Sequence, residues 1–173
     1  MKIKFHAIIL VFVTLTIAVG CAIEPMQDGI MAVPLRPVAT TTTRSNTLRS
    51  LASRAAYKHG IDHKLFHALV KHESAWDPYA VSRKGARGLT QIMPRTGLSQ
   101  CGLRRSYLFN PELNLNCGAF YFSKLLRRFK NVKLALAAYN SGEGRVARLG
   151  RVPRIRETQR YVKRVMKSWQ RGR

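Results

Sequence analysis

A carboxylate stands on the apolar face of one predicted helix, and this combination limits what the chain can become more than any other feature. Apolar residues recur there at steps of three and four, the spacing of one helix face: Leu65, Phe66, Leu69 and Val70. Glu73 occupies the next position on that face. A carboxyl group held against hydrocarbon loses hydration, which raises its pKa. Such a glutamic acid stays protonated near neutral pH, as a general acid must.

The helix alone leaves two interpretations of Glu73 open. The side chain could reach water from the edge of the stripe, beside Lys71 and His72, or it could serve a function. We expect this helix to begin after Asp62, a residue type that is favoured at helix N-caps. We expect it to end at Asp77, because a proline follows and the residue before a proline is disfavoured in a helix.

Three separated motifs decide between these interpretations. They are Glu73-Ser74, then GARGLTQIMP over residues 85–94, and then AYNSG over residues 138–142. In order, spacing and identity they resemble the catalytic domain of the family 1 soluble lytic transglycosylases, whose fold is like that of goose-type lysozyme. The similarity runs from Leu48 to Val165, so the chain looks like a small stand-alone member of that family.

The resemblance implies a mainly α fold: one lysozyme-like helical domain with a small β-hairpin or extended loop beside the cleft. Segment 81–92 corresponds to that hairpin or loop, and its glycines argue against a helix. The apolar periodicity independently predicts further helices, one of them opened by Asn110 and Pro111. The expected ranges are 45–58, 111–129, 132–139 and 156–169.

We expect three parts along the chain. Residues 1–20 carry two lysines and then an apolar run of thirteen residues, which suits a signal peptide and is too short to span a membrane. Cleavage after residue 20 would expose Cys21, and a lipidated Cys21 would make the chain an outer-membrane-anchored lipoprotein. Residues 21–44 contain three prolines and four consecutive threonines without a period, which indicates a flexible tether. Residues 45–173 are the expected catalytic domain.

Cysteine and histidine are the residue types of this chain that could form a disulfide or bind a metal. Cys101 and Cys117 lie within the predicted domain, and an exported chain would join them in a disulfide. The stretch after residue 72 begins like an HExxH metalloprotease motif but has Trp76 in place of the second histidine. We expect no metal and no cofactor, because solvated positions explain the histidines that are spaced by four: His59, His63 and His67.

The acidic residues point to a single catalytic carboxyl group. Glycosidases normally use two carboxylates about 5–10 Å apart, yet this chain has eight acidic residues in all, and few of them lie near a motif. The resemblance implies the same, because lytic transglycosylases cleave the β-1,4 bond between N-acetylmuramic acid and N-acetylglucosamine with one glutamate. Glu73 would protonate the leaving oxygen and then, as a base, direct the 6-hydroxyl onto C1, giving a 1,6-anhydro sugar.

The resemblance also implies supporting roles. Ser74 would bind the substrate or orient Glu73, and Tyr139 would direct its phenol at the Glu73 carboxyl or at the acetamido group. The family's common methionine or tryptophan is Thr90 here, which alters a contact at that subsite. The other substrate-binding positions that the resemblance implies are Gly88, Leu89, Gln91, Met93, Asn140, Glu157 and Tyr161.

The chain is strongly basic, with 31 basic and 8 acidic residues and a net charge of +23. This charge favours anionic partners, namely peptidoglycan peptides, teichoic acids or the head groups of a membrane surface. A nucleic-acid-binding or membrane-surface module built on the basic C-terminal helix is a competing class. The export signal and the lack of a nucleic-acid-binding motif argue against nucleic acid as a partner.

We therefore expect an exported, monomeric peptidoglycan lytic transglycosylase of the periplasm or cell envelope. One alternative is a lysozyme-type hydrolase. Another is a non-catalytic, basic wall-binding component of a secretion or conjugation apparatus, the kind of machine that small members of this family accompany. Intact Glu73, Gln91 and Tyr139 argue against the non-catalytic alternative.

Overall fold

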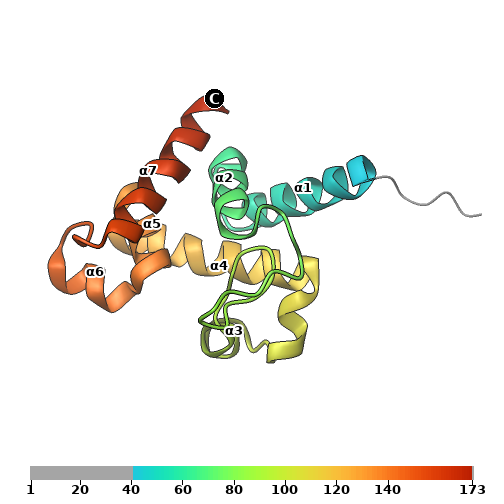
Figure 1. Ribbon diagram of the computed structural model, residues 1–173, viewed down its shortest axis with the longest axis horizontal. Coiled ribbons are helices and arrows are strands. Elements are labelled where there is room, and N and C mark those ends of the chain that lie inside the picture. The colour runs from blue at the N-terminus through green and yellow to red at the C-terminus, as the bar shows by residue number, and fades with distance from the viewer. Residues whose placement is uncertain (1–40, 173) are drawn as a thin grey trace, which may run out of the picture. The chain divides into compact units, whose positions relative to one another are not determined.

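The computed structural model describes residues 41–172, and these form helices joined by loops without a strand among them (Figure 1). The predicted mainly α fold is confirmed. None of these helices combines the length and the apolar character that are needed to cross a bilayer. The predicted signal peptide, Cys21 and most of the predicted tether lie outside the described residues. In chain order the helices are α1 (Thr41–Lys58), α2 (His63–Ser74), α3 (Pro94–Cys101), the 3₁₀ helix η1 (Arg105–Phe109), α4 (Pro111–Phe129), α5 (Val132–Ser141), α6 (Glu143–Leu149) and α7 (Arg156–Arg171).

Helix α4 lies at the centre of the packing and contacts α1, α3, α5 and η1. In Figure 1, α5, α6 and α7 gather towards its C-terminal end. Its start is as predicted: Pro111 is in the first turn, and the Asn110 side chain accepts a hydrogen bond from the Leu113 N–H at 3.1 Å. It ends where Lys130 adopts a left-handed conformation with φ 50°.

Helix α2 begins as predicted and ends earlier than predicted. The Asp62 carboxylate accepts hydrogen bonds from the N–H groups of the first turn, at 2.8 and 3.1 Å. The helix stops at Ser74 rather than at Asp77, because Ala75 and Trp76 both turn left-handed, with φ 53° and 71°. The Ser74 hydroxyl accepts the Trp76 N–H at 3.1 Å and fixes this turn. Glu73 is therefore in the last helical turn, directly before the chain changes direction.

The other helices show which local sequence signals were sufficient to predict a helix. The predicted helices at 132–139 and 156–169 are present as α5 and α7, each about two residues longer at its C-terminal end. Helix α1 begins at Thr41, so the last four residues of the predicted tether are helical. Helices α3, α6 and η1 were not predicted, because each is only five to eight residues long and shows no clear apolar stripe.

A single buried cluster joins the main helices. Phe66 and Leu69, from the apolar stripe of α2, are fully buried together with Phe122 of α4 and Leu136 of α5. Helix α2 packs against both α1 and α7. The stripe that builds this core continues to Glu73, so the helix that anchors the fold also carries the candidate acid.

Segment 81–92 is an extended loop and not a regular hairpin. It holds two isolated antiparallel bridges, one between Val81 and Arg87 and one between Arg87 and Ile92. The loop is tied to α4 by Asn114, whose side chain is fully buried. Its amide oxygen accepts from the Thr90 N–H at 2.8 Å and from the Thr90 hydroxyl at 2.7 Å, and its amide nitrogen donates to the Arg87 carbonyl at 3.0 Å. These three hydrogen bonds and two bridges all involve residues within the six-residue stretch 87–92.

The predicted disulfide is confirmed. Cys101, the last residue of α3, is bonded to Cys117 in α4, with the Cα atoms 5.8 Å apart. The bond closes a loop that contains η1 and the start of α4. In a loop of this length the entropic model gives about 3 kcal/mol of stabilisation.

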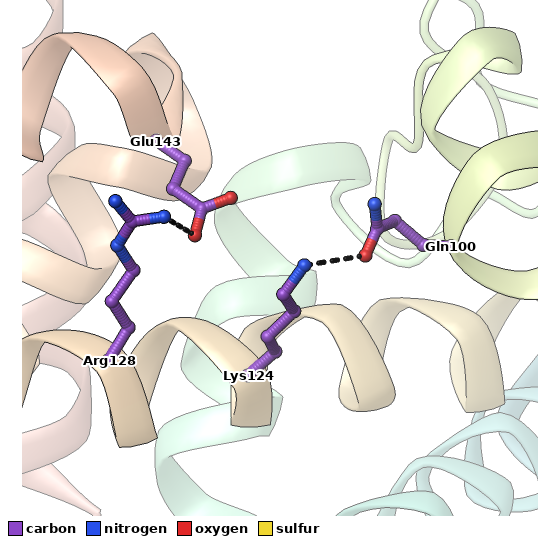
Figure 2. A network of polar contacts seen from close by, with 4 residues as sticks. All are labelled: Gln100, Lys124, Arg128 and Glu143. Atoms are coloured by element: carbon purple, nitrogen blue, oxygen red, sulfur yellow. Dashed lines mark hydrogen bonds and ion pairs between the residues drawn. The ribbon is translucent and has the colours of Figure 1, made fainter.

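Two polar contacts along α4 join neighbouring helices to it (Figure 2). The Lys124 ammonium donates to the Gln100 amide oxygen of α3 at 3.1 Å. One turn further, the Arg128 guanidinium pairs with the Glu143 carboxylate at the start of α6, at 2.6 Å. Exposed ion pairs contribute only about 0–1 kcal/mol, so these contacts orient α3 and α6 more than they stabilise the fold.

Two helical glycines allow a matched test of how closely α4 approaches the loop. A Cβ added at Gly118 would lie closer than 3.0 Å to three atoms of the buried Thr90 side chain, whereas a Cβ at Gly144 would meet nothing within 4 Å. We expect Gly118→Ala to lower the free energy of unfolding by about 1–3 kcal/mol, the usual result of overpacking. Gly144→Ala should raise it by up to about 1 kcal/mol, because alanine has the higher helix propensity.

Urea denaturation of both variants and the parent protein measures this difference. Equal effects of the two substitutions would contradict the close contact between α4 and the loop.

Candidate active site

Glu73 opens into a cavity of about 390 Å³ between the end of α2, the 81–92 loop and the start of α7. Five predicted substrate-binding residues line the same cavity: Gln91, Met93, Tyr139, Asn140 and Glu157 of α7. The loop adds residues that the sequence did not single out: Ser82, Arg83, Lys84 and Ala86. The only sequence signal for these four was their position directly before and within the GARG motif. The structure thus brings together residues from three motifs that are far apart in the sequence.

Burial controls the protonation of Glu73. Loss of hydration raises the pKa of its carboxyl group from the usual 4.5 to about 7. The Tyr161 hydroxyl of α7 donates a hydrogen bond to Glu73 Oε1 at 2.6 Å, and this bond acts in the opposite direction because it stabilises the charged form. The carboxyl group can therefore hold a proton near neutral pH and can also exist as a supported carboxylate.

The structure gives Tyr139 another hydrogen-bond partner than the predicted one. Its hydroxyl donates to the Thr90 carbonyl at 2.8 Å and not to Glu73. Its ring packs against Tyr121 and Phe122 of α4, so this tyrosine ties α5 to the loop while it lines the cavity. The direct partner of the Glu73 carboxyl is Tyr161, for which the resemblance implied a substrate-binding position.

Gln91 adopts a left-handed conformation with φ 48° and braces the loop. Its amide nitrogen donates to the carbonyl of Ala80 at 3.1 Å and to that of Gly88 at 3.0 Å. Both amide hydrogens are then used within the loop. The group that Gln91 can offer to a ligand in the cavity is its carbonyl oxygen.

Three predicted positions support the site from behind and do not line the cavity. The Ser74 hydroxyl is buried, donates to the Val70 carbonyl at 3.3 Å and accepts the Trp76 N–H at 3.1 Å, so it is used within the turn that follows α2. Leu89 is fully buried in the core. A Cβ at Gly88 would lie closer than 3.0 Å to the Leu108 carbonyl and to the Asn114 amide, so the glycine serves close packing rather than close approach to a glycan.

Thr90 also points into the protein. Its side chain is fully buried, and its hydroxyl donates to Asn114. The cavity of Glu73 is lined without it. The small threonine at this position fits the close approach of Gly118, which would leave no room for a methionine or a tryptophan in the same orientation.

The histidines that are spaced by four do not converge. His59 is hydrogen-bonded to the Asn116 side chain at 2.9 Å, and His67 is hydrogen-bonded to Ser53 at 3.0 Å. Within residues 41–172, no three side chains of the metal-binding types are grouped closely enough to hold an ion.

Comparisons with known proteins agree with this geometry. Residues 50–162 match the family described as "Transglycosylase SLT domain". Membrane-bound lytic murein transglycosylase C of Edwardsiella ictaluri is 33% identical over 122 residues, which are 61% of this chain and 34% of that protein. Membrane-bound lytic murein transglycosylase F of Desulfosudis oleivorans is 35% identical over 111 residues, 60% of this chain and 24% of that protein. The chain thus spans about a third or less of the length of these relatives.

Solved structures show the same fold. The 70 kDa soluble lytic transglycosylase of Escherichia coli superposes with a TM-score of 0.63 and 31% identity, over 69% of this chain and 23% of that chain. A complex of the 70 kDa soluble lytic transglycosylase with bulgecin A gives a TM-score of 0.64 at 31% identity, over 71% of this chain and 24% of that chain.

The raised pKa of Glu73 predicts a pH dependence of stability. Between pH 4.5 and about 7 the folded protein keeps a proton on Glu73 that the unfolded chain has released, so stability falls as the pH rises through this window. Glu73→Gln is neutral at every pH and should lack this loss. We expect the stability of the parent protein relative to the variant to fall by up to about 3 kcal/mol between about pH 4 and about pH 8.

Denaturant unfolding of both proteins at the two pH values measures this effect. A difference in stability that does not change with pH would contradict the burial of the carboxyl group.

Proposed function

Because the chain belongs to the transglycosylase SLT domain family, we propose that it is a peptidoglycan lytic transglycosylase. It cleaves the β-1,4 bond between N-acetylmuramic acid and N-acetylglucosamine and leaves a 1,6-anhydro end. The observation that carries the proposal is the state of Glu73, a carboxyl group with a pKa of about 7 in a cavity that is lined by all three motifs. A group with this pKa is available both as an acid and as a base near neutral pH.

In the first half of the reaction, protonated Glu73 gives its proton to the oxygen that leaves C1. The muramoyl 2-acetamido oxygen stabilises the positive charge that develops on the ring. The carboxylate that remains on Glu73 keeps the hydrogen bond from Tyr161, which lowers the energy of this charged state. The reaction needs no metal and no cofactor.

In the second half, the Glu73 carboxylate takes the proton from the 6-hydroxyl of the same sugar, and that oxygen attacks C1. The hydroxyl is held within the same molecule, so its effective concentration exceeds that of water. Gln91, Met93 and Asn140 support this step as walls of the cavity that position the sugar, with the Gln91 carbonyl oxygen as an acceptor for a sugar hydroxyl.

The position of Glu157 supports a second candidate function, that of a lysozyme-type hydrolase. It lines the same cavity as Glu73, whereas Glu143 is paired with Arg128 and Asp77 accepts the Tyr79 N–H at 2.9 Å. Two carboxylates in one cavity would suit a lysozyme-type hydrolase, with Glu157 as the base that activates water. We favour a substrate-binding role for Glu157, because the family to which the chain belongs is that of the transglycosylases.

We further propose that the protein acts in the bacterial cell envelope. Residues 1–20 export it, residues 21–44 tether it with Cys21 as a lipid anchor, and residues 45–173 act on the wall as a monomer. The relatives that are named membrane-bound lytic murein transglycosylases support this placement. The net charge of +23 supports anionic envelope polymers as further partners, and a secretion or conjugation apparatus remains a predicted one.

Mass analysis of the fragments released from purified peptidoglycan tests the reaction. The expected products are lighter by one water and have no reducing muramic acid end. Glu73→Gln should lower the rate by about 10²–10⁴-fold, since this is the usual contribution of acid catalysis. Glu157→Gln, the matched change in the same cavity, should lower the rate much less and leave the anhydro products unchanged.

Hydrated products, together with an equal loss for the two variants, would overturn the proposal in favour of the hydrolase. Absence of any product would favour the non-catalytic, wall-binding alternative.

Tyr161 is a positioning residue in this proposal, and its removal has a signed effect on pH dependence. Tyr161→Phe removes the hydrogen bond that stabilises the Glu73 carboxylate, so the pKa of Glu73 should rise further. The alkaline limb of the pH–rate profile should move to higher pH, and the maximal rate should fall as the carboxylate loses its support. Tyr57→Phe is the control, because Tyr57 is 88% exposed on α1. An alkaline limb that stays in place would contradict this role.

A further inference from the structure

Three arginines surround a second cavity, on η1 and on the 81–92 loop. This three-arginine pocket is about 410 Å³ and is lined by Arg87, Arg104 and Arg105, together with Ser106 and Phe109. We propose that it is an oxyanion-binding site that holds a carboxylate of the peptides attached to the glycan strand. The assignment of the anion to the peptides of the glycan strand rests on the proposed function, whereas the binding of an oxyanion does not.

No acidic side chain of the described residues neutralises the three-arginine pocket. No acidic residue lines it, and the one ion pair found among residues 41–172 joins Arg128 to Glu143 elsewhere. The Arg87 Nε atom is buried and has no hydrogen-bond partner within the same residues. Arg87 as a whole is half-buried, and a buried donor without a hydrogen-bond partner is unfavourable. An anion seated among the three guanidinium groups would remove this penalty.

Packing and hydrogen bonds hold the Arg87 side of the pocket in place. The Arg87 guanidinium lies over the Phe109 ring, 5.0 Å from its centroid. The carbonyl groups of Arg87 and Leu108 both accept from the Asn114 amide, at 3.0 and 2.8 Å. Arg104 and Arg105 lie within the loop that the disulfide closes. Arg87, which is held in place, therefore loses less entropy on binding than the exposed side chains of Arg104 and Arg105.

The three-arginine pocket and the cavity of Glu73 share the 81–92 loop. Ala86 lines the cavity of Glu73, and the next residue, Arg87, lines the three-arginine pocket. Arg87 bridges to Val81 and to Ile92 in extended conformation, where successive side chains point to opposite sides. An anion in the pocket is therefore separated from the bound glycan by this loop alone.

The chemistry of the substrate selects the anion. The sugar rings of the cleaved strand are uncharged at the scissile bond, and the negative charge is on the carboxylates of the attached peptides. The guanidinium group matches a carboxylate with two parallel hydrogen bonds. Phosphate offers the same contacts, so phosphate-bearing envelope molecules are the source that the experiment must separate from the peptide.

Binding is measured directly with two probes, inorganic phosphate and the tripeptide L-Ala-γ-D-Glu-meso-diaminopimelate. The affinity for the tripeptide should fall at least tenfold in Arg104→Ala/Arg105→Ala. It should be unchanged in Arg148→Ala/Arg171→Ala, a matched loss of two exposed arginines that do not line either cavity. An equal loss of affinity in both double variants would mean that the tripeptide responds to the net charge of the protein and not to the pocket, which would overturn the proposal. Binding of phosphate without binding of the tripeptide would overturn the carboxylate assignment.

Cleavage supplies the second readout. The parent protein should cleave strands that carry peptides faster than strands stripped of them by an amidase, and this preference should fall at least fivefold in Arg104→Ala/Arg105→Ala. A preference that is unchanged in that variant would overturn the role of the pocket in substrate selection. If no strand is cleaved by any variant, the proposed activity fails while the tripeptide measurement still decides whether the pocket binds an oxyanion.

Discussion

The fully buried amide of Asn114 is the interaction on which the functional half of this protein depends. It links α4, the 81–92 loop and η1, and each of its hydrogen-bonding groups is used by one of these partners. A buried polar group that lost its partners would cost about 1–3 kcal/mol, so the three segments are held to one another or are lost together. The loop forms a wall of the cavity of Glu73 on one side and of the three-arginine pocket on the other.

The site also shows a conflict between stability and chemistry. Burying Glu73 on the stripe that builds the core raises its pKa, and the folded state becomes less stable when the carboxyl group ionises. Tyr161 softens this conflict with a single hydrogen bond. The site therefore keeps the acid form available without making the base form inaccessible, which is the condition for one residue to serve both steps of a reaction.

Local signals predicted much of the fold. Asp62 and Asn110 each accept hydrogen bonds from the first turn of a helix, and such caps are visible in sequence because they act within three residues. The end of α2 was not visible, since the left-handed turn occurs at an alanine and a tryptophan, residue types that do not mark such a conformation.

The candidate site was predicted in part for the same reason. Glu73 stands out because a carboxylate on an apolar stripe can be seen along one helix. Its partner Tyr161 is 88 residues away, and which of two buried tyrosines turns its hydroxyl towards Glu73 depends on how α5 and α7 pack. The three-arginine pocket was not predicted, because its residues come from the 81–92 loop and from the η1 region, which meet only in the folded chain.

The disulfide between Cys101 and Cys117 adds a temporal element to this architecture. Thiols stay reduced in the cytosol and pair in oxidising compartments. Under the proposed export, a newly made chain lacks the bond that ties α3 to α4, and the segment between them gains this constraint only after export. The redox state of the surroundings thus decides when the segment between α3 and α4 reaches its stiffest form.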